Sequence, residues 1–434
     1  MSPAHGSRYN QGVRRRWIRR TLWLAGFACL WLNVGDDPPL ASGGLVLAAT
    51  PQSVTVGVIA AAPTPATARL FDAQGVVVAQ HEAALARRRH EFTFAQLAPG
   101  TAYDFAIELG DGRVERGSAR TAPADDAAPV RFAFLGDSGG QPWWVWLQSA
   151  PAMHWPARWG WFADSSAVTQ VGAAVAEFAP DFVVHLGDVV YPWGRHAQYR
   201  TGYFRPFAEV LRRAPVWAVL GNHDVMDAGG LQLLQNVRPR SVERDGDGRN
   251  FSQAFGSVRV IGLDCTSEMT GDRFEPGHPA HTFLLRELAS CSEPWIVVVS
   301  HYPIRSGSRS RGRADLNLHL MPELVRHQVS LYLCGHDHCY QRFAADSGEP
   351  YQVISGGGGK SLYAVQPHRR AQVQASAYHW CGAEVRGGRF RVRAYDIDGV
   401  VLDDFEVPLP STEGLARVLE QNPERGRRIA ALPK

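Results

Sequence analysis

The stretch PDFVVHLGDVVYPWG, residues 180–194, joins an apolar run to a polar, glycine-containing exit. Asp181 to Leu186 has the length and composition of a buried β-strand, and the chain then turns at Gly187-Asp188. Side chains that serve a site in an α/β fold gather at the carboxyl ends of such strands. The same pattern occurs four more times, in Arg131–Leu135 before Gly136-Asp137, Val216–Leu220 before Gly221-Asn222-His223-Asp224, Trp295–Ser300 before His301, and Ser330–Cys334 before Gly335-His336-Asp337-His338.

Seven residues at these exits can bind metal ions. They supply three imidazoles, two carboxylates, a phenol and an amide oxygen, which is a mixed nitrogen and oxygen set suited to first-row metals. His336 and His338 are two residues apart after a strand, so both can project to the same side. Two ions about 3.5–4 Å apart would need a shared carboxylate. The candidate ligands are Asp137, Asp188, Tyr191, Asn222, His301, His336 and His338.

The region before the first of these strands has a different texture. Residues 43–122 are rich in Val, Ala and Thr, and turn signals separate short alternating runs. The predicted strands are Gln52–Ile59, Ala68–Phe71, Val76–Gln80, Glu91–Phe94 and Ala102–Leu109. Residues 97–103 have the L-x-P-G-T-x-Y form of a tyrosine corner, in which the phenol closes a loop. This region resembles a fibronectin type III β-sandwich, which would serve as a spacer or an oligomer contact.

Residues 1–40 have the form of an export signal. A run of arginines between residues 14 and 20 precedes the apolar segment Thr21–Leu32. A membrane span needs about 20 apolar residues, so this shorter segment suits a signal peptide. The alternative is an uncleaved N-terminal anchor, the only membrane contact that we expect. Both predict an exported protein, which is periplasmic, secreted or anchored.

Composition excludes several classes of protein. Of the 434 residues, 45% are hydrophobic and 20% charged, which excludes a disordered chain. The net charge of +3 is too small for a protein that binds nucleic acid through its phosphates. The six cysteines contain no C-x-x-C pair, so neither a zinc finger nor a disulfide framework is expected, and no pairing is assigned.

The ordered blocks GDSGG, GDVVY, GNHD, VVSHYP and CGHDH resemble those of the purple acid phosphatases, within the calcineurin-like metallophosphoesterase superfamily. The resemblance covers Val130 to Val407. It implies an α/β fold with four layers, α/β/β/α, over residues 130–410. Residues 411–434 would then form a C-terminal tail.

The resemblance also implies a dinuclear phosphohydrolase that cleaves phosphate monoesters by attack of metal-bound hydroxide. Asp188 would bridge the two ions. Two carboxylates and a phenolate suit Fe(III) at the first position, and neutral ligands suit divalent Zn, Fe or Mn at the second. The first position would take Asp137, Asp188, Tyr191 and His338, and the second Asp188, Asn222, His301 and His336.

His223 is left outside both metal positions and is predicted to act as an acid or donor toward the substrate. Asp224 either orients His223 or is a turn residue. The family has a further histidine after the equivalent of His301, and here Ser310 stands at that place. The neighbouring Arg309 and Arg311 would either bind phosphate or belong to a solvated basic loop.

Two further segments leave alternatives open. Gln141–Phe162 holds six of the thirteen tryptophans, which would either stack on an aromatic leaving group or form a packed insertion. Gly356–Gly359 followed by Lys360 lacks the spacing of a phosphate-binding loop, which favours close backbone packing. The alternative functions are a phosphodiesterase or nucleotide pyrophosphatase and, from another class, a non-catalytic surface module.

Overall fold

The structure, a computed structural model, describes residues 40–139, 166–196, 198–237, 248–266, 271, 273–345 and 348–433. The predicted signal peptide or anchor, apart from Leu40, lies outside the described residues. The whole of the Trp-rich segment Gln141–Phe162 lies outside them as well. No helix within the described ranges is both long and apolar enough to cross a membrane.

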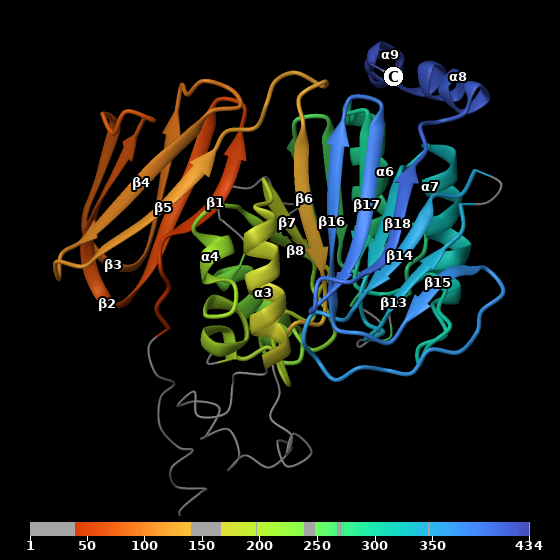
Figure 1. Ribbon diagram of the computed structural model, residues 1–434, viewed down its shortest axis with the longest axis horizontal. Helices are drawn as coiled ribbons and strands as arrows, with labels where there is room; N and C mark the ends of the chain where they lie inside the picture. The colour runs from red at the N-terminus through yellow and green to blue at the C-terminus, as the bar shows by residue number, and fades with distance from the viewer. Residues whose placement is uncertain are drawn as a thin grey trace, which may run out of the picture.

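The N-terminal region is an all-β unit, at the left of Figure 1. Its strands form one hydrogen-bonded sheet in the order β1-β2-β4-β5, with β3 also paired to β2. The strands are β1 (Leu45–Thr50), β2 (Ser53–Phe71), β3 (Val77–Ala95), β4 (Ala102–Leu109) and β5 (Val114–Arg120).

The prediction of separate short strands on either side of residues 60–67 is wrong, because β2 is continuous and 19 residues long. The prolines at 63 and 65 suggest a break, since proline cannot donate to a strand ladder. However, the register between β2 and β3 shifts between Ile59 and Thr64 and again between Thr64 and Ala66. Such bulges leave residues unpaired and bend a strand without ending it.

The hydrogen bond expected of the predicted tyrosine corner is present. The backbone amide of Ala98 donates to the phenol oxygen of Tyr103 at 3.1 Å. Tyr103 is buried, so this bond closes the loop before β4 against the core. The likeness of the whole unit to a fibronectin type III domain stays a prediction.

The rest of the chain contains two further sheets. One has six strands in the order β18-β17-β16-β6-β7-β8, and the other has seven in the order β15-β13-β14-β12-β11-β10-β9. Strands of the first are β6 (Val130–Leu135), β7 (Phe182–His185), β8 (Val216–Ala218), β16 (His379–Arg386), β17 (Arg389–Asp396) and β18 (Val401–Val407). Strands of the second are β9 (Phe251–Phe255), β10 (Val258–Leu263), β11 (Trp295–Ser300), β12 (Leu331–Cys334), β13 (Tyr340–Phe343), β14 (Tyr351–Ser355) and β15 (Ala371–Ala375).

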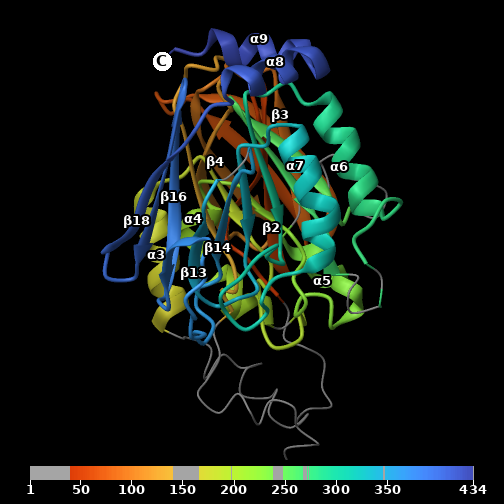
Figure 2. The same ribbon diagram turned by 90° about the vertical axis from the view of Figure 1, so that its right-hand side faces the viewer.

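Helices cover the outer faces of these sheets, with α3 on one side and α6 and α7 on the other (Figure 2). The helices are α3 (Ser166–Phe178), α4 (Ala208–Leu211), α5 (Leu231–Asn236), α6 (Pro279–Ser290) and α7 (Met321–Arg326), with short irregular helices at Arg200–Phe204, Ala228–Gly230 and Leu316–Leu320.

The alternation of side chains along the strands explains the layers. On β6, Phe132 and Phe134 belong to the core between the sheets, while Leu135 packs with the helices outside. On β11, Trp295 lies in the core between the sheets and Ile296 lies in the outer core beside α6 and α7. Successive residues of a strand point to opposite faces, so fully apolar strands need a partner layer on each side. The predicted α/β class with four layers is confirmed.

The expected C-terminal tail contains two helices, α8 (Thr412–Gln421) and α9 (Pro423–Ala431). They lie across one end of the sheets in Figure 1. The buried guanidinium of Arg425 donates to the carbonyls of His327 at 2.6 Å and Gln328 at 2.8 Å, at the end of α7. Arg428 pairs with Asp126 at 2.6 Å and so holds the segment that leads into β6.

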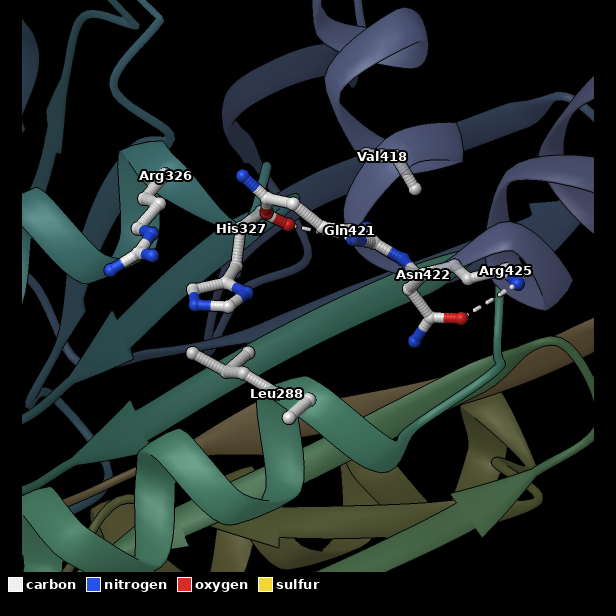
Figure 3. Close-up of a pocket in the computed structure, with 8 residues that line it drawn as sticks. Leu288, Arg326, His327, Val418, Gln421, Asn422 and Arg425 are labelled. Carbon is white, nitrogen blue, oxygen red and sulfur yellow. Dashed lines mark hydrogen bonds between the residues drawn. The ribbon is translucent and has the colours of Figure 1, made fainter.

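A cavity of about 250 Å³ lies between α8, α9 and the helices α6 and α7. Figure 3 shows the side chains of Leu288, His327, Asn422 and Arg425 around it. The Arg425 guanidinium already donates to carbonyls on this side, so its burial is compensated by hydrogen bonds. These contacts tie α9 to the sheet layers.

The N-terminal sheet packs closely on the six-stranded half of the fold. The amide of Ser118 donates to the carbonyl of Arg212 at 3.0 Å, just after α4. Arg120 pairs with Asp181 at 2.6 Å. A Cβ on Gly117 would lie 2.3 Å from the Arg212 carbonyl oxygen, so only glycine allows this approach.

Gly117→Ala is therefore expected to lower the free energy of unfolding by about 1–3 kcal/mol, because the contacted atom belongs to the backbone and cannot rotate away. Chemical denaturation followed by tryptophan fluorescence measures this. The control is Gly43→Ala, whose Cβ would meet Glu115 at an ordinary 3.5 Å. A Gly117→Ala protein as stable as the control would contradict the close interface.

Candidate metal centre

The predicted ligands come together where strands of both large sheets end. Asp137 follows β6, Asp188 and Tyr191 follow β7, and Asn222 follows β8. The other sheet supplies His301 after β11, and His336 and His338 after β12. β6, β7 and β8 run parallel, as do β11 and β12, so the carboxyl ends of each group meet at one edge of its sheet.

Glycines at the exits leave the space that these side chains fill. A Cβ on Gly221 would lie 2.2 Å from Oδ1 of Asp188, and one on Gly335 would lie 2.5 Å from Oδ2 of Asp137. A Cβ on Gly187 would lie 2.6 Å from Nδ1 of His301. The small residue at the end of one strand therefore makes room for a ligand from another strand.

Three of the candidate ligands have left-handed backbone conformations. The φ angles are 57° for Asp137, 52° for Asp188 and 68° for His336. Such conformations cost about 1–3 kcal/mol each for non-glycine residues and often mark functional sites. They are held by hydrogen bonds, since the amide of His336 donates to Asp137 at 2.9 Å and the amide of His223 donates to Asp188 at 2.8 Å.

The first group of donor atoms surrounds the phenol oxygen of Tyr191. It lies 3.0 Å from Oδ1 of Asp137, 3.0 Å from Oδ2 of Asp188 and 3.2 Å from Nε2 of His338. All four residues are buried. This grouping brings together two carboxylates, a phenol and an imidazole.

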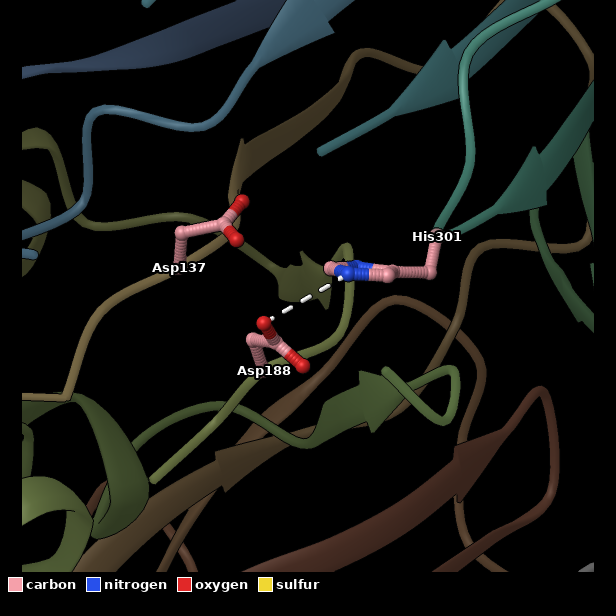
Figure 4. Close-up of side chains that lie close together, drawn as sticks. All are labelled: Asp137, Asp188 and His301. Atoms are coloured by element: carbon pink, nitrogen blue, oxygen red, sulfur yellow. Dashed lines mark ion pairs between the residues drawn. The ribbon is translucent and has the colours of Figure 1, made fainter. Parts of the chain in front are cut away.

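The second group surrounds the amide oxygen of Asn222. It lies 3.1 Å from Nε2 of His301 and 3.0 Å from Nδ1 of His336, and these two ring nitrogens are 3.3 Å apart. Nε2 of His301 is also 3.5 Å from Oδ2 of Asp188, the contact drawn in Figure 4. Asp188 therefore belongs to both groups.

These separations fit atoms that share an ion. Ligand atoms about 2.1 Å from one metal lie roughly 3.0 Å apart at right angles and roughly 3.4 Å apart in a tetrahedron. The far nitrogens of His301 and His338 face the carbonyls of Leu186 at 2.8 Å and Ser361 at 2.7 Å. A neutral ring that donates there leaves Nε2 unprotonated, which is how metal-binding histidines are usually oriented.

The ionisable groups strongly perturb one another. Burial would raise the pKa of Asp188, but the charges of His301 and His223 hold that pKa well below its ordinary value. Burial would lower the pKa of His301, but Asp188 raises it to about 10. Burial, aided by His301, lowers the pKa of His336 to about 3. Burial, with Asp137 and Asp188, raises the pKa of Tyr191 well above its usual value. Such a cluster is typical of a functional site.

His223 lies beside the first group, with its ring centroid 4.5 Å from that of Tyr191. Its Nδ1 is 2.6 Å from the carbonyl of Pro192, which orients the ring. The carboxylate of Asp224 instead accepts from the amides of Val189 at 3.0 Å and Gly221 at 2.9 Å. Asp224 thus joins the exits of β7 and β8. His223 is oriented instead by the carbonyl of Pro192, a residue that no sequence pattern indicated.

The loop after β11 places Ser310 against the histidine-bearing loop. Its hydroxyl donates to Asp337 at 2.6 Å and its amide at 3.1 Å. Arg309 lies over the ring of Tyr363, 5.4 Å from its centroid, and Tyr363 stacks on His338 with centroids 4.0 Å apart. No sequence motif pointed to Tyr363.

The glycine run packs against the backbone, as predicted. A Cβ on Gly358 would lie 2.5 Å from the carbonyl oxygen of Gly136, and one on Gly356 would lie 2.3 Å from that of Asp337. The run delivers Lys360 to the site, where its amide donates to the carbonyl of Asp137 at 3.0 Å. Burial lowers the pKa of the Lys360 ammonium to about 8, although Asp188 and Asp137 oppose the shift.

Comparison with known proteins agrees with this geometry. Residues 130–340 match the calcineurin-like phosphoesterase family. The chain is similar to purple acid phosphatase 17 of Arabidopsis thaliana, with 27% identity over 266 residues that cover 56% of this chain and 71% of the relative. It is also similar to tartrate-resistant acid phosphatase type 5 of Sus scrofa, with 29% identity over 273 residues that cover 56% and 73%.

Two solved structures share the fold. The purple acid phosphatase PPD1 from yellow lupin (Lupinus luteus) seeds has a TM-score of 0.68 at 15% identity, covering 86% of this chain and 75% of the other. PhoD has a TM-score of 0.60 at 12% identity, covering 91% and 99%. Both likenesses extend beyond the phosphoesterase match at residues 130–340.

Asp188→Ala should reduce the bound metal from two ions per chain, because it removes the one carboxylate common to both groups. Elemental analysis of the purified protein measures this, and circular dichroism checks that the fold is kept. Asp227→Ala is the control, because Asp227 is a carboxylate on the same loop as Asn222 but belongs to neither group of donor atoms. Its carboxylate lies 4.0 Å from the guanidinium of the exposed Arg195. Two ions retained in Asp188→Ala would contradict a shared ligand.

Proposed function

Because the chain carries a calcineurin-like phosphoesterase domain, we propose that it hydrolyses phosphate monoesters at a dinuclear metal centre. One observation carries this proposal: seven donor side chains from strand exits of two sheets fall into two groups that share Asp188. The similarity to acid phosphatases from plants and mammals supports the same reaction. The substrate partner is a phosphate ester.

We assign the first metal position to Asp137, Asp188, Tyr191 and His338, and the second to Asp188, Asn222, His301 and His336. Two carboxylates and a phenol favour Fe(III) at the first position, and the neutral ligands of the second favour a divalent ion, Zn, Fe or Mn. When bound, such ions neutralise phosphate charge and lower the pKa of water so that it can attack phosphorus near neutral pH.

The side chains outside the two groups then orient the substrate. With Nδ1 of His223 directed at Pro192, Nε2 is the nitrogen available for the leaving-group oxygen or a phosphate oxygen. The amide of His223 donates to Asp188, so the residue is fixed to the shared carboxylate. Ser310 stands where the family has a second histidine, and its hydroxyl is a far weaker acid than an imidazolium. That hydroxyl donates to Asp337.

The N-terminal segment supports export of the protein. We propose that residues 14–32 direct it out of the cytoplasm, after which it is periplasmic, secreted or anchored. The N-terminal sequence of the protein purified from its host distinguishes a cleaved signal from an anchor.

The substrate class is tested with an aryl phosphate and a bis-aryl phosphate. The metal-loaded protein should hydrolyse the monoester with a kcat/KM at least tenfold above that for the diester. A preference for the diester would favour a phosphodiesterase or nucleotide pyrophosphatase, and hydrolysis of neither would favour a non-catalytic surface module. Asp188→Ala serves as the inactive reference.

His223→Ala should lower kcat by roughly 10²–10⁴, the usual contribution of a positioned acid or base. The loss should shrink for aryl phosphates whose leaving group has a low pKa, since these need no protonation. His81→Ala, an exposed histidine on β3, is the control. An equal loss for good and poor leaving groups would assign His223 to phosphate binding instead.

A further inference from the structure

A positive charge that has no carboxylate partner among the described residues borders the first metal position. The ammonium of Lys360 lies 4.6 Å from the centroid of the Tyr191 ring. Lys360 is half-buried, and within the described parts of the chain no ion pair or side-chain hydrogen bond to it is seen. The nearby acids Asp137 and Asp188 are engaged with Tyr191, His338 and His301.

The position of Lys360 is built into the backbone. Each of the four preceding glycines fits where a Cβ would collide with a neighbouring atom, and Gly359 also has a φ of 151°. The Lys360 amide donates to the carbonyl of Asp137, and the Ser361 carbonyl faces His338 at 2.7 Å. The same short segment therefore contacts Asp137 and His338, two of the three residues around the Tyr191 oxygen, and directs a cation at the Tyr191 ring.

We propose that Lys360 sets the donor strength of Tyr191, since its ammonium stabilises the ring electrons and so weakens their donation to an ion in the first position. A cation over an aromatic face attracts the ring's electrons, most strongly where water is partly excluded. Lys360 is thus a positioning residue that acts through Tyr191. A weaker phenolic donor leaves the ion a stronger electron acceptor toward water and phosphate.

This inference rests on the proposed function, because it needs ferric iron bound to Tyr191. Such a pair absorbs visible light when an electron moves from the ring to the iron. The charge of Lys360 lowers the energy of the ring electrons more than the energy of the iron orbitals that accept the electron. The reason is distance, because a bound iron would lie beyond the phenol oxygen. Removing the charge should therefore reduce the energy of the absorption.

The experiment compares full-length proteins reconstituted with ferric iron and zinc, at one mildly acidic pH. Lys360→Met should move the visible maximum to longer wavelength by roughly 10–20 nm, with iron content unchanged. Lys360→Gln should do the same, and Lys360→Arg, which keeps a cation over the ring, should restore the wild-type maximum. kcat for an aryl phosphate should fall severalfold in the two neutral variants.

The matched control is Arg309→Met. Arg309 is also a cation over a tyrosine, but Tyr363 stacks on His338 and is not an assigned ligand. Its removal should leave the maximum unchanged. An unmoved maximum in both neutral Lys360 variants, loss of iron from both, or an equal shift in Arg309→Met would overturn the inference.

Tyr191→Phe separates this result from failure of the proposed function. An iron-loaded wild type without a visible band, or a band that persists in Tyr191→Phe, would remove Tyr191 from the first position and contradict the ligand assignment. A wild-type band that disappears in Tyr191→Phe but ignores Lys360 would contradict only the role of Lys360.

Discussion

The arrangement of the centre depends on the carboxylate of Asp188, which is buried where the exits of both sheets meet. Its Oδ1 accepts from the amide of His223, and its Oδ2 faces both Tyr191 and His301. A buried carboxylate is costly unless its oxygens are satisfied, so each neighbour must keep its place. The left-handed backbone of Asp188 and the missing Cβ of Gly221 are what allow the carboxylate to reach this point.

The two sheets make this meeting point rigid. Central strands of both, such as β7, β11 and β12, are fully buried, and the aromatic rings of Phe132, Phe182 and Trp217 stack in the core between the sheets. Backbone bonds join neighbouring exits, as from the amide of Asp137 to the carbonyl of Gly187 at 3.0 Å. Such close packing fixes the donor atoms before any ion binds. The N-terminal sheet and α9 strengthen the fold away from the ligands.

The side chains next to the two groups of donor atoms set the hydrogen bonds and charges around this centre. Ser310 is held by Asp337, between the two histidines of the β12 exit, so that loop is braced by a neutral hydroxyl. Two cations, Lys360 and Arg309, lie over Tyr191 and Tyr363. Charges beside a metal centre change how strongly its ligands donate and how well it attracts an anion. The residues around the ligands can therefore adjust the centre without changing its set of donor atoms.

The sequence by itself determined the α/β class, the buried strands that lead to the ligands and the identity of the candidate ligands. These follow from local patterns, since an apolar run, a glycine and a polar residue are neighbours in the chain. It also determined the tyrosine corner through residues 97–103.

Only the tertiary structure decided which partner each side chain takes. It joined the predicted short strands into β2, where pairing across bulges outweighs the local signal of the prolines, and into β3, which pairs along most of β2. It gave the orientation of His223 to the Pro192 carbonyl and tied Asp224 to backbone amides. It also brought Lys360 onto Tyr191, which is 169 residues earlier in the chain. Contacts between residues so distant in sequence arise from the packing of the two sheets, and no local pattern encodes them.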